Sequence, residues 1–61
     1  MLTIKPGTLL KYKCSPDRIF VKVIRVMSRT DDKVVFLGRF YGIYQEWVIT
    51  KDSEKCWEES V

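Results

Sequence analysis

The chain has 61 residues, a length that allows one domain with a small core and a thin margin of stability. Its composition, 46% hydrophobic, 13% aromatic and 31% charged, differs from that of a disordered chain. The sequence contains no histidine, the commonest general base and metal ligand at neutral pH, which argues against catalysis and against a bound metal. We therefore expect one non-enzymatic domain over residues 1–61, without a cofactor.

The net charge of +3 hides an uneven distribution along the chain. The first 30 residues hold seven basic residues and one acidic residue, a net charge of +6. The other 31 residues hold four basic and seven acidic residues, a net charge of −3. A basic half of this kind is a reason to consider a nucleic-acid partner.

The chain contains two cysteines, Cys14 and Cys56, which are too few for the disulfide framework of a small secreted domain. The N-terminal residues lack the apolar stretch of about 7–15 residues that a signal peptide needs. No segment approaches the roughly 20 apolar residues that span a bilayer. We therefore expect a cytoplasmic protein with reduced thiols, in which Cys14 is an inert residue on an apolar strand face.

Alternating apolar residues and intervening turn residues divide the chain into short strands. The pattern predicts strands at about 8–14, 19–27, 33–37 and 44–50, with turns rich in proline, glycine, serine and aspartate between them. After the last strand, Asp52 or Ser53 is a suitable N-cap for one or two helical turns. Cys56 or Trp57 would hold this tail against the rest of the domain.

The second predicted strand breaks strict alternation, because its polar residues Lys22 and Arg25 are three positions apart. Its many β-branched residues nevertheless favour a strand over a helix. We therefore expect a bulge near Val23-Ile24 that turns both side chains inward. Bulged, strongly bent strands allow small sheets to close, so the predicted fold is all-β, an SH3-like antiparallel barrel of four to five strands with a short C-terminal helical turn.

Several short motifs occur in an order that resembles a known family. They are Lys5-Pro6-Gly7, Tyr12-Lys13, Ser28-x-Thr30, Val34-Val35-Phe36 and Tyr41-Gly42-x4-Trp47-Val48. This order, over about residues 4–48, is similar to that of a family of short bacterial domains of unknown function. The resemblance implies a small β-barrel module without an assigned activity. The tail departs from the family pattern, since family members tend to continue with arginine, proline and an apolar pair.

Four aromatic residues, Phe40, Tyr41, Tyr44 and Trp47, lie within eight positions, in and after a glycine-bracketed connection at 38–42. We expect Trp47 and Tyr41 to fill the interior of the barrel, which leaves Phe40 and Tyr44 outside beside Arg39. Arginine and aromatic side chains are enriched at protein interfaces. Arg39, Phe40 and Tyr44 are therefore the predicted partner-binding patch.

The absence of a catalytic set and the aromatic segment together favour a small protein-interaction module. Such a module would act by occlusion, as an inhibitor or an accessory subunit of another protein. Strands with apolar residues on both faces, such as Leu9-Leu10 and Val34-Val35, hold more apolar surface than one small core can hide. We therefore also expect a homodimer.

The alternative function is that of a single-stranded nucleic-acid-binding protein that uses the basic N-terminal half. Small barrels bind single strands through cationic side chains that contact phosphates and aromatic side chains that stack on bases. Lysines on outward strand positions can also serve only to solvate a sheet and to protect its edges. The candidate phosphate-contacting residues are Lys11, Lys13, Lys22, Arg25 and Arg29.

Overall fold

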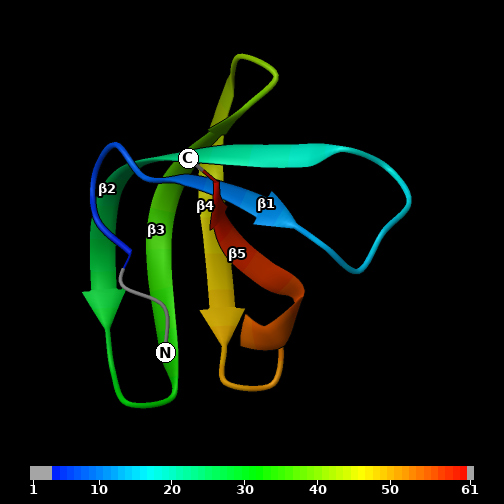
Figure 1. Cartoon of the computed structure of the whole chain (residues 1–61). Coiled ribbons are helices and arrows are strands. Elements are labelled where there is room, and N and C mark those ends of the chain that lie inside the picture. Colours follow the sequence, from blue (N-terminus) through cyan, green and yellow to red (C-terminus); the bar gives the residue numbers. More distant parts are fainter. Residues whose placement is uncertain (1–3, 61) are drawn as a thin grey trace.

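The computed structural model describes residues 4–60 of the chain, which form five β-strands and one short 3₁₀ helix (Figure 1). This arrangement confirms the predicted all-β class and the predicted antiparallel pairing. No helix within these residues is long and apolar enough to cross a membrane. The elements are β1 (Leu9–Tyr12), β2 (Ile19–Arg29), β3 (Lys33–Phe40), β4 (Ile43–Thr50), η1 (Glu54–Cys56) and β5 (Trp57–Ser60).

The five strands form one sheet in the order β4-β3-β2-β1-β5. The long strand β2 holds it together, because its first part pairs with β1 at 19–22 and its second part pairs with β3 at 22–29. In Figure 1, β2 first runs alongside β1 and then turns to run alongside β3. The sheet is therefore strongly bent, and β3 with β4 packs against β1 with β5.

The predicted bulge in β2 is confirmed, because the register between β2 and β3 shifts between Val23 and Arg25. Lys22 and Arg25 both reach solvent, and Val23 is fully buried, as expected. Ile24 is half-buried rather than fully inward, since it is the extra residue of the bulge. A second shift follows further along the strand, and bulges increase the local bend and twist of a strand.

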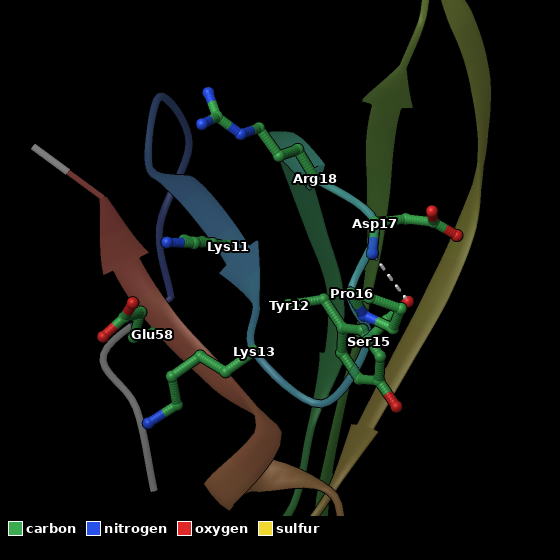
Figure 2. A pocket seen from close by; sticks show the side chains of 8 residues that line it. All are labelled: Lys11, Tyr12, Lys13, Ser15, Pro16, Asp17, Arg18 and Glu58. Carbon is green, nitrogen blue, oxygen red and sulfur yellow. Dashed lines mark hydrogen bonds between the residues drawn. The ribbon is translucent and has the colours of Figure 1, made fainter.

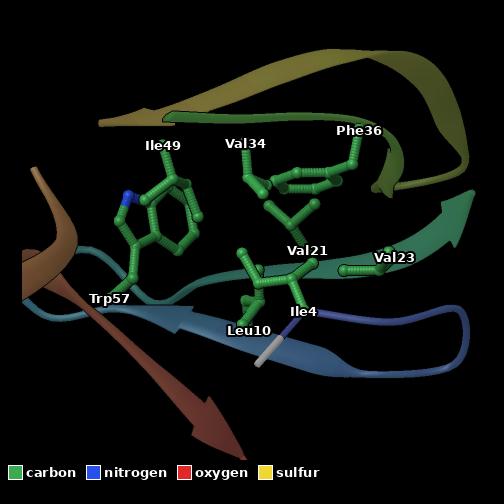
Figure 3. Packing of buried hydrophobic residues seen from close by; sticks show 8 residues of the cluster. All are labelled: Ile4, Leu10, Val21, Val23, Val34, Phe36, Ile49 and Trp57. Carbon is green, nitrogen blue, oxygen red and sulfur yellow. The ribbon is translucent and has the colours of Figure 1, made fainter. Parts of the chain in front are cut away.

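The core lies between the two halves of the bent sheet and receives side chains from all five strands (Figure 3). Figure 3 shows the side chains of β3 and β4 meeting those of β1 and β2, with Trp57 of β5 at one end of the cluster. Strand alternation accounts for this set, because every second residue of a strand points to the same face. The buried residues are Ile4, Leu10, Val21, Val23, Val34, Phe36, Ile49 and Trp57.

The connection between β3 and β4 is shorter than the predicted glycine-bracketed loop at 38–42. It consists of Tyr41 and Gly42, with φ angles of 50° and 79°, and two successive positive φ angles are typical of a tight hairpin turn. Gly38 lies within β3 because packing leaves it no room for a side chain. A Cβ there would lie 2.6 Å from Cγ1 of Val21 and 2.8 Å from Cδ1 of Trp47.

The tight turn reverses the predicted positions of two aromatic side chains. Tyr41 was expected in the interior, but it lies at the tip of the hairpin and is 81% exposed. Phe40 was expected on the surface, but it ends β3 on the inward face and packs against the core. The cause is the extension of β3 through Gly38 to Phe40, which continues the alternation that buries Val34 and Phe36.

The predicted short helical turn of the C-terminal tail is present as one 3₁₀ turn, and the tail then continues as strand β5. Strand β5 pairs with β1, so that Trp57 lies opposite Tyr12. Trp57 is only 8% exposed and belongs to the core, which confirms that it holds the tail in place. Since the edge of β1 provides backbone hydrogen-bonding partners, an extended tail satisfies more backbone groups than a short exposed helix would.

The prediction of reduced thiols is wrong, because Cys14 and Cys56 form a disulfide with Cα atoms 5.2 Å apart. Cys14 is exposed and does not occupy an apolar core position. The two residues are 42 positions apart in sequence, and the pairing of β1 with β5 brings them together. The N–H of Lys13 also donates a hydrogen bond of 2.6 Å to the carbonyl oxygen of Cys56.

We predict that reduction of this disulfide lowers the free energy of unfolding by about 4 kcal/mol, because the bond closes a long loop in the unfolded chain. Denaturant unfolding with and without dithiothreitol measures the effect. A Cys14→Ser/Cys56→Ser variant should be destabilised by a similar amount and should not respond to the reductant. An unchanged unfolding midpoint of the wild-type protein in dithiothreitol would contradict the disulfide.

We also predict that Gly38→Ala destabilises the protein by about 1–3 kcal/mol, because the added methyl group overpacks the contact between Val21 and Trp47. Urea unfolding of Gly38→Ala, Val21→Ala and the double variant forms a double-mutant cycle. The cost of the double variant should be smaller than the sum of the two single costs, because Val21→Ala removes the nearest clashing atom. Strictly additive costs would show that the methyl group does not meet Val21.

Candidate functional site

An apolar hollow on the described surface has a volume of about 360 Å³. Ligand sites commonly have volumes of roughly 300–1,000 Å³ and are lined mainly by apolar and aromatic side chains. No charged residue lines this hollow. We call it the aromatic groove, and its lining residues are Tyr12, Ile19, Phe40, Trp47, Val48 and Trp57.

Four rings of the aromatic groove contact one another in a continuous series. The ring centroids of Tyr12 and Trp57 are 5.0 Å apart, those of Trp57 and Trp47 are 6.1 Å apart, and those of Trp47 and Phe40 are 5.8 Å apart. The rings are tilted against one another by 57° to 81°, which is a favourable arrangement for aromatic pairs. The lining side chains therefore pack against one another, and the protein's own residues form the groove.

The groove forms where the two edge strands of the sheet approach each other. Trp47 belongs to β4 and Trp57 to β5, which stand at opposite ends of the strand order. Their ring contact bridges these two edges, while Tyr12 of β1 and Phe40 of β3 extend the lining on either side. The bend of β2 therefore brings together lining residues that are as far apart in sequence as Tyr12 and Trp57.

Trp47 only partly fits the prediction that it is a core residue. Its indole packs against the core and over Gly38, but the side chain is half-buried and lines the groove. Its indole N–H is shielded from solvent and donates no hydrogen bond to the residues that the structure describes. A covered donor without a partner costs free energy, so the apolar contacts of the ring must outweigh that cost.

A second hollow, of about 430 Å³, lies on the other side of Tyr12 (Figure 2). Its lining combines three basic residues with two acidic residues. Figure 2 shows the charged ends of Lys11, Lys13 and Arg18 pointing in different directions, away from a common centre. The local contact that orders its rim is a hydrogen bond of 3.2 Å from the N–H of Asp17 to Oγ of Ser15. Divergent charges of this kind do not define a binding site for one small ion.

The structure divides the predicted partner-binding patch between two faces of the sheet. Arg39 and Tyr44 lie directly opposite each other on β3 and β4, and both are exposed on the outer face. Phe40 lies on the inner face and lines the aromatic groove. Tyr12, Ile19 and Trp57 complete the groove, although the sequence analysis did not place them together.

The five basic residues proposed for nucleic acid do not form one surface. The guanidinium group of Arg29 donates a hydrogen bond to the carbonyl oxygen of Ile4, so this side chain has a structural role at the end of β2. Lys13 follows the end of β1 and lines the second hollow. The remaining three, Lys11, Lys22 and Arg25, are exposed on the outer face of the sheet.

The chain matches no protein-family model, no curated protein and no solved structure. The resemblance of residues 4–48 to a family of bacterial domains therefore stays a hypothesis. Within residues 4–60, no group of three or more cysteine, aspartate or glutamate side chains is arranged to hold a metal ion. The function proposed below therefore depends on the geometry of the aromatic groove and of the sheet surfaces.

Proposed function

We propose that this chain is a small, non-enzymatic protein-interaction module, and that the aromatic groove is its binding surface. The observation that carries the proposal is a preformed groove of four contacting rings with no charged lining residue. Aromatic side chains at the centre of an interface commonly supply much of its binding energy. The groove suits an apolar side chain of another protein.

The strand beside the groove suggests the form of the partner. β4 pairs with β3 along one side, and no described strand pairs with its other side. Natural edge strands are often protected by lysine, proline or a bulge. β4 holds one charged residue, Glu46, contains neither lysine nor proline, and pairs with β3 in an unbroken register. We propose that an extended segment of the partner adds to this edge and places an apolar side chain in the groove.

A second copy of the same chain meets this description, because β4 is itself an extended apolar strand. Two of its apolar side chains, Ile43 and Val48, are more than half exposed. Pairing of two β4 strands would cover them and would give the homodimer that the sequence analysis expects. In both cases this chain would cover an extended strand of the partner. Covering a partner's surface in this way fits an inhibitor or an accessory subunit that acts by occlusion.

The bent sheet also supports a finer description of the fold. We propose that it is an SH3-like barrel in which the contact between Trp47 and Trp57 closes the gap between β4 and β5. Small barrels close through strongly bent, bulged strands. The two register shifts in β2 are the kind of strand irregularity that we expect in a closed small barrel.

The disulfide bears on where the protein works. Disulfides persist in oxidising compartments and are rare in the cytoplasm. The bond between Cys14 and Cys56 therefore fits an extracellular or periplasmic protein better than the cytoplasmic protein that the sequence analysis expects. We propose an oxidising compartment as its working location.

We predict that Phe40→Leu weakens partner binding at least about tenfold, because it removes one ring of the groove while it keeps an apolar side chain in the core. The matched control is Tyr44→Leu, which removes a ring from the outer face. Affinity capture from the source cells, with nuclease present, compares the wild-type protein with both variants. The wild-type protein and Tyr44→Leu should retain the same bound protein, and Phe40→Leu should lose it.

Size measurement by light scattering tests the homodimer with the same three proteins. Circular dichroism first establishes that both variants are folded, which we expect because leucine keeps a large apolar side chain at each position. Equal binding by folded Phe40→Leu and by the wild-type protein would contradict the groove as the binding surface. Loss of every captured protein after nuclease treatment would contradict a protein partner.

A further inference from the structure

A row of side chains crosses the outer face of the sheet, opposite the core. Strand pairing places Leu9 opposite Lys22, Lys22 opposite Arg39, and Arg39 opposite Tyr44. Each of these residues alternates with an inward-facing neighbour, such as Leu10, Val21 or Gly38, and so points outward. We call these four residues the outer row.

Two positively charged side chains lie opposite each other at the centre of the outer row. Lys22 and Arg39 are directly cross-strand, and like charges in that position destabilise a sheet. Neither side chain forms an ion pair within the part of the chain that the structure describes. Folding therefore works against this pair of cations, and an anionic ligand that neutralises both of them would remove the repulsion.

A third cation extends the positive surface. Lys11 is opposite Phe20, two residues before Lys22 on β2, so Lys11 and Lys22 are diagonal neighbours on the same face. Two carboxylates lie at the margins of the face. Glu58 is opposite Lys11, and Glu46 is diagonal to Arg39. Neither carboxylate separates Lys22 from Arg39.

Aromatic rings flank the cations on the same face. Tyr44 is 58% exposed at one end of the outer row, and Phe20 is 37% exposed beside Lys22. Cations that follow a phosphate backbone, together with rings that stack on bases, are the usual components of a surface for single-stranded nucleic acid. A duplex would meet the same cations but has no free base faces to offer the rings.

We propose that the outer row, together with Lys11 and Phe20, is a binding surface for single-stranded nucleic acid. Lys22 and Arg39 contact successive phosphates, Lys11 contacts a further phosphate, and Tyr44 and Phe20 stack on bases. This surface is independent of the aromatic groove, which lies on the inner face. The phosphodiester charge is the same in reducing and oxidising compartments, so the disulfide does not affect this binding chemistry.

Fluorescence anisotropy with a labelled mixed-sequence DNA 12-mer and the matching RNA tests the proposal. Three phosphate contacts predict a slope of about −2 for the logarithm of the binding constant against the logarithm of the salt concentration, since each contact on a single strand contributes about 0.7. A Lys22→Gln/Arg39→Gln variant should bind at least about tenfold more weakly, and its slope should be reduced to about −0.7.

The controls separate the named residues from net charge and from the groove. Lys33→Gln/Lys55→Gln removes the same total charge from exposed positions outside the outer row and should bind as the wild-type protein does. Tyr44→Leu should weaken binding about fivefold or more through the lost stacking, whereas Phe40→Leu should not. In the test of the aromatic groove, Phe40→Leu is the disruptive variant and Tyr44→Leu is the control. In the test with nucleic acid, Tyr44→Leu is the disruptive variant and Phe40→Leu is the control.

Several results would overturn the proposal. The first is an equal loss of binding in Lys22→Gln/Arg39→Gln and in Lys33→Gln/Lys55→Gln. The second is binding of the duplex 12-mer as tight as that of the single strand. The third is equally tight binding of polyphosphate or of vesicles with anionic lipid. The last two would show a surface that recognises negative charge alone. Absence of binding at low salt by a folded wild-type protein would also overturn it, without any bearing on capture of a protein at the groove.

Discussion

The bend of β2 is the constraint on which the rest of the molecule depends. This strand pairs with β1 through its first residues and with β3 through its later ones, so its path decides how the two halves of the sheet meet. Two register shifts occur in the second part, and each adds a residue that has no opposite partner. Without that bend, the apolar faces of β1 and β3 would not lie against each other, and residues 4–60 contain only the short helix η1 besides the strands to cover them.

The same bend produces two different surfaces from one sheet. On the inner face, the edges of β4 and β5 approach until the rings of Trp47 and Trp57 touch, and the remaining space becomes the aromatic groove. On the outer face of the sheet, Lys22 lies opposite Arg39, and both side chains are exposed to solvent. The disulfide stabilises the inner surface, because Cys56 directly precedes Trp57 and Cys14 lies two residues after Tyr12.

Much of the fold follows from local sequence patterns. Alternation predicts the strands, and the three-residue spacing of Lys22 and Arg25 predicts the bulge, because a strand can expose both residues only if it is irregular between them. The errors arise where a distant contact decides the local structure. Gly38 resembles a turn residue in sequence, but the side chains of Val21 and Trp47 require a glycine within the strand. Because β3 continues through Gly38, Phe40 lies on the inner face and Tyr41 lies in the exposed turn, the reverse of the predicted positions.

The groove was harder to foresee than the strands, since it needs the pairing of β1 with β5. The tail contains only four residues of strand, and its charged residues favour a short helix by composition. A signal was nevertheless present, because each cysteine has an aromatic residue close to it in sequence, so a bond between Cys14 and Cys56 would have placed Tyr12 near Trp57. A prediction of two reduced thiols leaves this constraint unused.

The contact between Trp47 and Trp57 is the most direct consequence of the bend, and a nuclear Overhauser effect measurement on the oxidised protein tests it. The chain has two tryptophans, so their indole protons can be assigned without ambiguity. We predict cross-peaks between the two indole rings, and further cross-peaks from Trp57 to Tyr12 and from Trp47 to Phe40. A spectrum in which Trp47 contacts only β3 and Trp57 contacts only β1 would show that the edges of the sheet stay apart, and would contradict both the core and the groove described above.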